Sequence, residues 1–130
     1  MGEGKLKNIS ILGSTGSIGV STLDVIARNL DRFKVVALTA QKNIDLLFQQ
    51  CVQFHPQYAV LQSEIAATEL RTRLQSIFPD IEVLSGDLAL EQVAGLSEVN
   101  IVMAAIVGAA GLLPTLAAVR AGKRVLLANK

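Results

Sequence analysis

Three glycines at three-residue spacing, Gly13, Gly16 and Gly19, are the part of this chain whose pattern most directly predicts chemistry. An apolar run precedes them, and Ser and Thr hydroxyls lie between them. Glycine tolerates positive φ and lets a backbone approach a ligand closely, and a helix that begins near Ser17 would direct its unpaired N–H groups toward an anion. The segment Gly13-Ser14-Thr15-Gly16-Ser17-Ile18-Gly19 therefore predicts a turn that binds the diphosphate of a dinucleotide.

A strand-to-helix turn can also need glycine for backbone reasons alone, without a ligand. That interpretation explains one glycine more readily than three at regular spacing with hydroxyl residues between them. A mononucleotide P-loop is excluded, because no Lys-Ser or Lys-Thr pair follows the glycines.

The end of the second predicted strand bears on which dinucleotide binds. NAD-binding domains usually carry Asp or Glu there, about twenty residues after the glycines, to accept a hydrogen bond from the ribose. Here the segment Thr39-Ala40-Gln41-Lys42-Asn43 has no acid, and Lys42 and Asn43 can donate to a 2′-phosphate. We therefore predict NADPH rather than NADH. The alternative interpretation of Lys42 is a solvent-exposed lysine at the start of a helix.

Alternating strand and helix patterns supply the elements that must position this turn. Strands are predicted over 8–12, 33–40, 58–61, 81–84, 100–103 and 125–127. Helices are predicted over 17–29, after a cap near Asn43, over 63–78, around 90–94 and over 112–121, with Leu30 and Ile77 counted on their apolar faces. This order, without an internal repeat, predicts an α/β fold with a doubly wound, mostly parallel sheet, a Rossmann-like NADP-binding domain. Residues 1–7 are expected to be a flexible lead-in and residues 8–130 the domain itself.

Composition narrows the function classes. The 130 residues suit one domain, and 51% hydrophobic against 18% charged residues favours a sheet buried on both faces. A net charge of +1, without a basic block and with few aromatic residues, predicts no nucleic-acid partner. The uncharged stretch 101–119 is interrupted by Gly108, Gly111 and Pro114, which favours a strand, a loop and a helix over a membrane span. With one cysteine and no signal-peptide pattern, we expect a cytoplasmic protein.

The other chemically capable residues predict no catalytic site. His55 precedes Pro56 in a predicted loop and is interpreted as a surface histidine, and Cys51 is interpreted as a core residue. Tyr58 has no lysine four residues later, so the Tyr-Lys pair of short-chain reductases is missing. No acidic residue follows Glu98, so a carboxylate cluster for a metal is not expected near the last strand.

Four blocks of sequence carry a resemblance to a known family. They are ISILGSTGSIG at 9–19, STLDV at 21–25, VMAAIVGAAGLLPT at 102–115 and LLANK at 126–130. Together they closely resemble 1-deoxy-D-xylulose 5-phosphate reductoisomerase, and the similarity extends from Asn8 to Lys130. The chain looks like the N-terminal, NADPH-binding domain of that family.

The resemblance implies a function and a set of site residues. The family uses NADPH and Mg or Mn to rearrange and reduce 1-deoxy-D-xylulose 5-phosphate, a sugar phosphate, to 2-C-methyl-D-erythritol 4-phosphate, in the non-mevalonate route to isoprenoids. By resemblance, the cofactor phosphates lie at Thr15, Gly16, Ser17 and Ile18, the adenosine phosphate at Gln41, Lys42 and Asn43, the nicotinamide side at Asn129 and the sugar phosphate at Lys130. The family often has Gly where this chain has Gln41.

The resemblance also implies what these residues leave out. The metal-binding carboxylates and the C-terminal domain of the family are expected after Lys130, so no catalytic residue is expected within this chain. The chain alone is then expected to bind NADPH without turnover and to form homo-oligomers. Two alternatives remain open at this point. One is a non-catalytic NADPH-sensing module, and the other is a semialdehyde dehydrogenase, which would need a catalytic cysteine in a later loop than Cys51.

Overall fold

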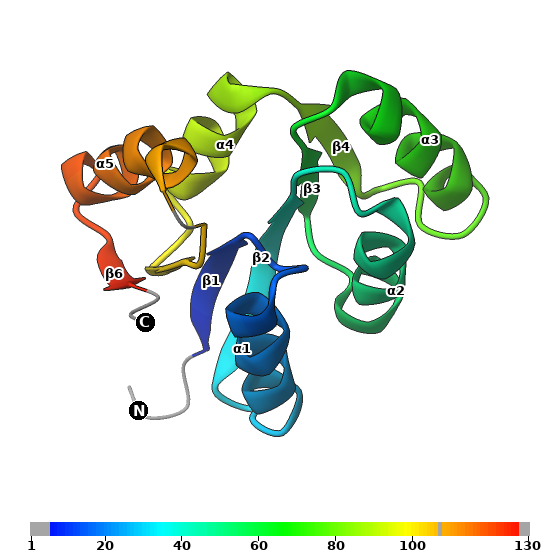
Figure 1. The fold of residues 1–130 in the computed structure, drawn as a ribbon. Coiled ribbons are helices and arrows are strands. Elements are labelled where there is room, and N and C mark those ends of the chain that lie inside the picture. Colours follow the sequence, from blue (N-terminus) through cyan, green and yellow to red (C-terminus); the bar gives the residue numbers. More distant parts are fainter. Residues whose placement is uncertain (1–5, 107, 128–130) are drawn as a thin grey trace.

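The computed structural model describes residues 6–106 and 108–127, in which strands and helices alternate (Figure 1). The strands are β1 (Lys7–Leu12), β2 (Phe33–Ala40), β3 (Tyr58–Leu61), β4 (Glu82–Ser85), β5 (Ile101–Ala104) and β6 (Arg124–Leu127). The helices are α1 (Ser17–Ala27), α2 (Ile44–Phe54), α3 (Glu64–Gln75), α4 (Asp87–Ala94) and α5 (Leu112–Arg120), with a 3₁₀ turn η2 (Ala109–Gly111) before α5.

The described strands form one sheet in the order β4-β3-β2-β1-β5-β6. Every described pair of neighbours runs parallel, and one register shift, between Ile9 and Ser10, interrupts the pairing of β1 with β2. The chain builds outward from β1 to β4 and then crosses to the other side of β1 for β5 and β6. The predicted doubly wound sheet is therefore confirmed. Its strand order reverses at β1, and ligands of such sheets bind beyond the carboxyl ends of the strands at that reversal.

Helices cover both faces of the sheet and bury an apolar core on each (Figure 1). On one face α1, α2 and α3 pack against the strands, with Leu47 and Leu70 fully buried. On the other face α4 and α5 do so through Val93 and Ala118. Because both faces are covered, the central strands are continuous apolar runs, as the composition predicted.

The predicted helix over 17–29 extends too far. It ends at Ala27. The side-chain amide of Asn29 donates a hydrogen bond to the Val25 carbonyl at 2.8 Å, in place of the bond that the Asn29 backbone N–H would make in a longer helix. Leu30 therefore lies beyond the helix and is 60% exposed, so its assignment to the apolar face is wrong.

The predicted helix over 63–78 is also too long at its carboxyl end. Its start is confirmed, because the Ser63 side chain accepts a hydrogen bond from the Ala66 N–H at 3.2 Å. It ends at Gln75, and the Ile77 and Phe78 N–H groups both donate to the Leu74 carbonyl in the turn that follows. Ile77, counted on the apolar face, is consequently 47% exposed.

The remaining predicted boundaries differ by a residue or less at most ends. The strands over 33–40 and 58–61 have the predicted bounds, and β1 begins at Lys7, inside the predicted lead-in. Gly122 terminates α5, one residue after the predicted helix end: its φ is 76°, and its N–H donates to the Val119 carbonyl at 3.0 Å.

The uncharged stretch 101–119 divides into β5, η2 and most of α5, as predicted. Among the described residues, no helix combines the length and apolarity that crossing a bilayer requires.

Gly19 allows α1 to pack directly against the turn that precedes it. A Cβ at this position would meet the backbone of Gly13 and would lie 2.6 Å from the Ser14 Cα, a separation that a real side chain does not tolerate. The missing side chain thus fixes how closely the first turn of α1 approaches the end of β1.

We predict that Gly19→Ala lowers the free energy of unfolding by about 1–3 kcal/mol, because overpacking against backbone outweighs the better helix propensity of alanine. Urea unfolding of the full-length protein measures this. Ser21→Ala, an exposed change on the same helix, is the control and should alter stability by less than about 0.5 kcal/mol. A Gly19→Ala protein as stable as the unchanged one would contradict the close contact.

Candidate functional site

The turn after β1 is anchored to the end of β2. The Gly13 N–H donates to the Thr39 hydroxyl at 2.9 Å, and the Ser14 N–H donates to the Thr39 carbonyl at 2.7 Å. Ser14 and Thr39 are both fully buried. The turn therefore sits rigidly at the carboxyl edge of the sheet, where the strand order reverses.

Helix α1 begins directly after this turn with unpaired donors. Gly16 is its N-cap and has no side chain to accept a hydrogen bond, and the first turn contains no acidic residue. The N–H groups of Ser17, Ile18 and Gly19 have no acceptor inside the helix, because the first turn of any helix lacks them. The end of α1 thus presents donors and the positive end of the helix dipole to a ligand.

The three glycines of the motif have different roles. Gly13 has φ 81° and lies 3.1 Å, measured from an ideal Cβ, from the Ala105 backbone, and Gly19 is required by its contact with the turn. Gly16 has an ordinary φ of −78°, it is exposed, and the nearest atom to a Cβ there is 3.8 Å away. The fold therefore does not need glycine at position 16. A ligand that approaches the backbone closely at this position would require a glycine there.

A cavity of about 290 Å³ opens beside this turn. It is lined by the turn, by α4 and by the loops that follow β2, β3 and β5. Its lining residues are Gly13, Thr15, Gly16, Gln41, Gln62, Leu90, Ala105, Ile106 and Ala110. The structure thus brings together Thr15, Gly16 and Gln41, three of the residues that the sequence predicted as cofactor contacts.

The other predicted site residues lie around this cavity or outside the described residues. Ser17 and Ile18 form the first turn of α1, and Lys42 is exposed between β2 and α2. Asn43 caps α2 as predicted, because its side-chain oxygen accepts the Leu46 N–H at 3.2 Å. Asn129 and Lys130 lie outside the described residues.

Gln62 was not predicted from sequence. It follows β3, lines the cavity and donates a hydrogen bond to the Asp87 carboxylate at 2.8 Å. A polar residue at the carboxyl end of a strand was the available signal, because all the parallel strands of the sheet end at the same edge.

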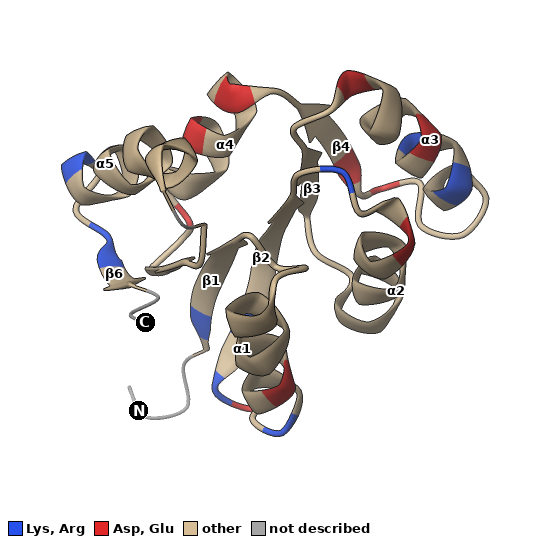
Figure 2. Cartoon of the chain, in the orientation of Figure 1, with Lys and Arg blue, Asp and Glu red and all other residues tan. Residues whose placement is uncertain are grey.

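The residues that line the cavity are uncharged. In the view of Figure 2, acidic and basic residues are interspersed over the helices and strand ends. Within residues 6–106 and 108–127, no group of three or more His, Cys, Asp and Glu side chains could hold a metal ion.

Cys51 and His55 are placed as the sequence predicted. Cys51 is fully buried on α2, and burial raises the pKa of its thiol to about 12, so it is not a nucleophile at neutral pH. His55 is exposed after α2, and its ring nitrogen lies 3.0 Å from Asp80. That hydrogen bond lowers the pKa of the Asp80 carboxyl.

The family model for 1-deoxy-D-xylulose 5-phosphate reductoisomerase matches residues 9–130. The chain belongs to this family. Proteins named 1-deoxy-D-xylulose 5-phosphate reductoisomerase from Methylococcus capsulatus and Nitrosomonas europaea are 64% and 58% identical to it, over 96% and 97% of this chain. The chain spans only 32% and 30% of the length of those two curated relatives.

Solved reductoisomerase structures share the fold. A reductoisomerase from Zymomonas mobilis in complex with NADPH matches 96% of this chain and 32% of its own length, with a TM-score of 0.89 and 42% identity. A reductoisomerase in complex with magnesium matches 96% of this chain and 31% of its own, with a TM-score of 0.91 and 43% identity. The Rossmann-like fold class is therefore confirmed.

We predict that native Cys51 reacts with a thiol reagent only as fast as the protein opens, and that denaturant releases this protection. Rapid labelling of the native protein would contradict the burial.

The raised pKa of Cys51 also makes the stability of the protein depend on pH. The thiol of the unfolded chain ionises near its ordinary pKa of 9.0, whereas burial delays ionisation of the folded thiol until about pH 12. The free energy of unfolding should therefore fall between these pH values, and fall less in Cys51→Ala. If the free energy of unfolding fell equally steeply with pH in the unchanged protein and in Cys51→Ala, the raised pKa would be contradicted.

Proposed function

We propose that these residues form the NADPH-binding domain of an enzyme that rearranges and reduces 1-deoxy-D-xylulose 5-phosphate to 2-C-methyl-D-erythritol 4-phosphate. The observation that carries the proposal is the open Gly16 position at the head of α1, between two glycines that the fold itself requires. Family membership and the similarity to a reductoisomerase in complex with NADPH support the same cofactor. NADPH supplies a hydride when bound, and the residues of this chain bind and orient it.

In this proposal the diphosphate lies against the first turn of α1. The backbone N–H groups of Ser17 and Ile18 donate to its oxygens, and the hydroxyls of Thr15 and Ser17 add donors. Gly16 leaves room for the diphosphate to approach the backbone. The positive end of the helix dipole favours the bound negative charge.

The adenosine phosphate is assigned to the loop between β2 and α2. Gln41 lines the cavity, and Lys42 and Asn43 follow it at the start of α2. No acid occurs between Ala40, where β2 ends, and Asn43, and Lys42 can pair with a 2′-phosphate. Asp45, in the first turn of α2, forms an ion pair with Arg73 at 2.8 Å. This assignment favours NADPH over NADH.

The remaining assignments depend on the rest of the protein. Asn129 is assigned to the nicotinamide side and Lys130 to the phosphate of the sugar substrate. The described residues hold no metal cluster, so the Mg or Mn ligands are assigned to parts of the protein other than those described. We propose that residues 8–130 act as one domain, that these residues alone bind NADPH without turnover, and that the enzyme is a cytoplasmic homo-oligomer.

We predict that Gly16→Asp raises the dissociation constant of NADPH at least tenfold, because a carboxylate would face the diphosphate. Stability should be kept or slightly raised, since Asp is a preferred N-cap and suits the helix dipole. Calorimetric titration and urea unfolding of the full-length protein measure the two effects. Gly16→Asn adds a side chain of nearly the same size without the charge, so the difference in NADPH affinity between the two variants measures the effect of the charge. Unchanged NADPH affinity in Gly16→Asp would reject the site.

We predict that Lys42→Ala weakens NADPH binding about tenfold or more while changing NADH binding little, because one charge-assisted hydrogen bond to the 2′-phosphate is worth about 1.5–3 kcal/mol. Lys34→Ala, which removes another exposed lysine from the amino-terminal half of β2, is the control and should change neither affinity. Equal weakening of both cofactors by Lys42→Ala would remove this residue from the phosphate site.

A further inference from the structure

Gln50 is a buried polar side chain whose hydrogen-bond partner is the glycine-containing turn. It lies on α2 and is 6% exposed. Its side-chain nitrogen donates to the Ser14 carbonyl at 2.9 Å, and its side-chain oxygen accepts from the Ser14 hydroxyl at 2.7 Å. Both ends of the amide are thus used on a single residue, 36 positions earlier in the chain.

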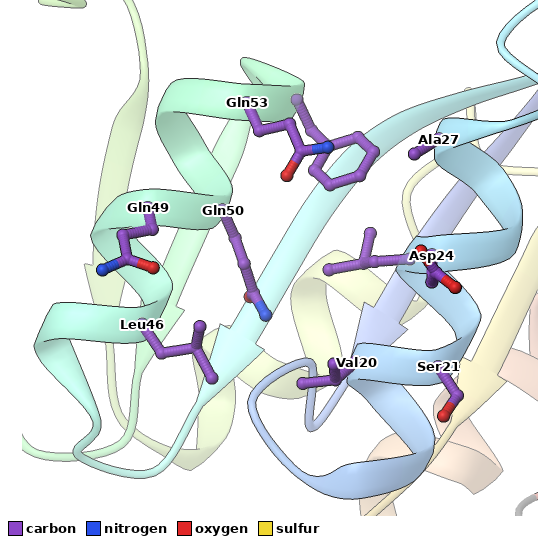
Figure 3. A pocket seen from close by; sticks show the side chains of 10 residues that line it. Val20, Ser21, Asp24, Ala27, Leu46, Gln49, Gln50 and Gln53 are labelled. Carbon is purple, nitrogen blue, oxygen red and sulfur yellow. The ribbon is translucent and has the colours of Figure 1, made fainter.

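The neighbouring glutamines on α2 have a different environment. Figure 3 shows Gln49, Gln50 and Gln53 on α2 opposite α1, and Gln50 extends into the space between the helices. A groove of about 300 Å³ lies there. Gln49 and Gln53 also line it, but both are exposed. Asp24, on α1, is the titratable residue among those that line the groove.

The contact fixes the orientation of one peptide group. The Ser14 carbonyl needs a donor, so only the observed orientation of the Gln50 amide satisfies both groups, and the reversed amide would bring two oxygens together. In a trans peptide the Ser14 carbonyl and the Thr15 N–H point in opposite directions. Gln50 therefore directs the Thr15 N–H away from α2, and Thr15 itself lines the cavity beside Gly16.

We infer that Gln50 is a positioning residue for the dinucleotide, which holds the Ser14–Thr15 peptide so that the Thr15 N–H faces the bound diphosphate. The inference rests on the proposed function. It also links two parts of the site, because α2 carries Gln50 in its interior and Lys42 and Asn43 at its start. This contact therefore holds the glycine-containing turn after β1 at a fixed distance from the loop between β2 and α2.

The test is Gln50→Glu in the full-length protein, with NADP⁺ as the probe. At pH 8 the carboxylate cannot donate to the Ser14 carbonyl, and we expect the NADP⁺ dissociation constant to rise at least tenfold in a protein that remains folded. Burial raises the pKa of such a carboxyl, so protonation at about pH 5.5 restores the donor. The affinity should then return to within about twofold of the unchanged protein at the same pH.

Gln53→Glu is the matched control, because it places the same charge on the same helix without reaching Ser14. It should bind NADP⁺ within twofold of the unchanged protein at both pH values. Any effect of pH on Asp24 or on the cofactor phosphate would also occur in the unchanged protein and in this control, so it can be subtracted.

The outcomes separate the two claims. If the unchanged protein does not bind NADP⁺, the proposed function fails. If it binds and Gln50→Glu binds equally at pH 8, or stays weak at pH 5.5, the inference about Gln50 is overturned and the function stands. Should Gln50→Glu not fold at pH 8, Gln50→Met replaces it and should bind at least tenfold more weakly at both pH values. Normal affinity in Gln50→Met, or loss of folding in both variants, would make Gln50 a core residue only.

Discussion

The proposed cofactor site is organised around the backbone N–H groups at the amino end of α1, which have no acceptor within the helix. The first N–H groups of a helix without a capping side chain are left to water or to a ligand. Here Gly16 occupies the N-cap, and no acidic side chain in the first turn compensates the helix dipole. The anion that would satisfy these donors is the diphosphate of the proposed NADPH.

The surrounding elements hold these donors at one edge of the sheet. The strand order reverses at β1, so the loops after β2 and β5 diverge on either side of the turn and leave a cavity between them. Thr39 ties the turn to β2, and Gln50 ties it to α2. Cys51 is fully buried, with its thiol pKa raised to about 12, and is a core residue rather than a nucleophile. The match to the reductoisomerase family argues against the semialdehyde dehydrogenase alternative.

Local patterns in the sequence predicted most of the fold and the position of the cavity. The strands over 33–40 and 58–61 and the cap at Asn43 depend on neighbouring residues, and each was predicted correctly. Leu30 and Ile77 were assigned to helices wrongly, because the spacing of apolar residues does not show where a helix ends. The contact between Gln50 and Ser14 and the distinct roles of Gly13, Gly16 and Gly19 depend on tertiary packing, which spacing alone does not reveal.

The most direct measurement is a crystal structure of the full-length protein with NADPH bound. We expect oxygens of the diphosphate to lie about 2.7–3.2 Å from the backbone nitrogens of Ser17 and Ile18. We also expect the adenosine phosphate to lie beside Lys42. A diphosphate bound elsewhere, for example in the groove between α1 and α2, would contradict the proposed site.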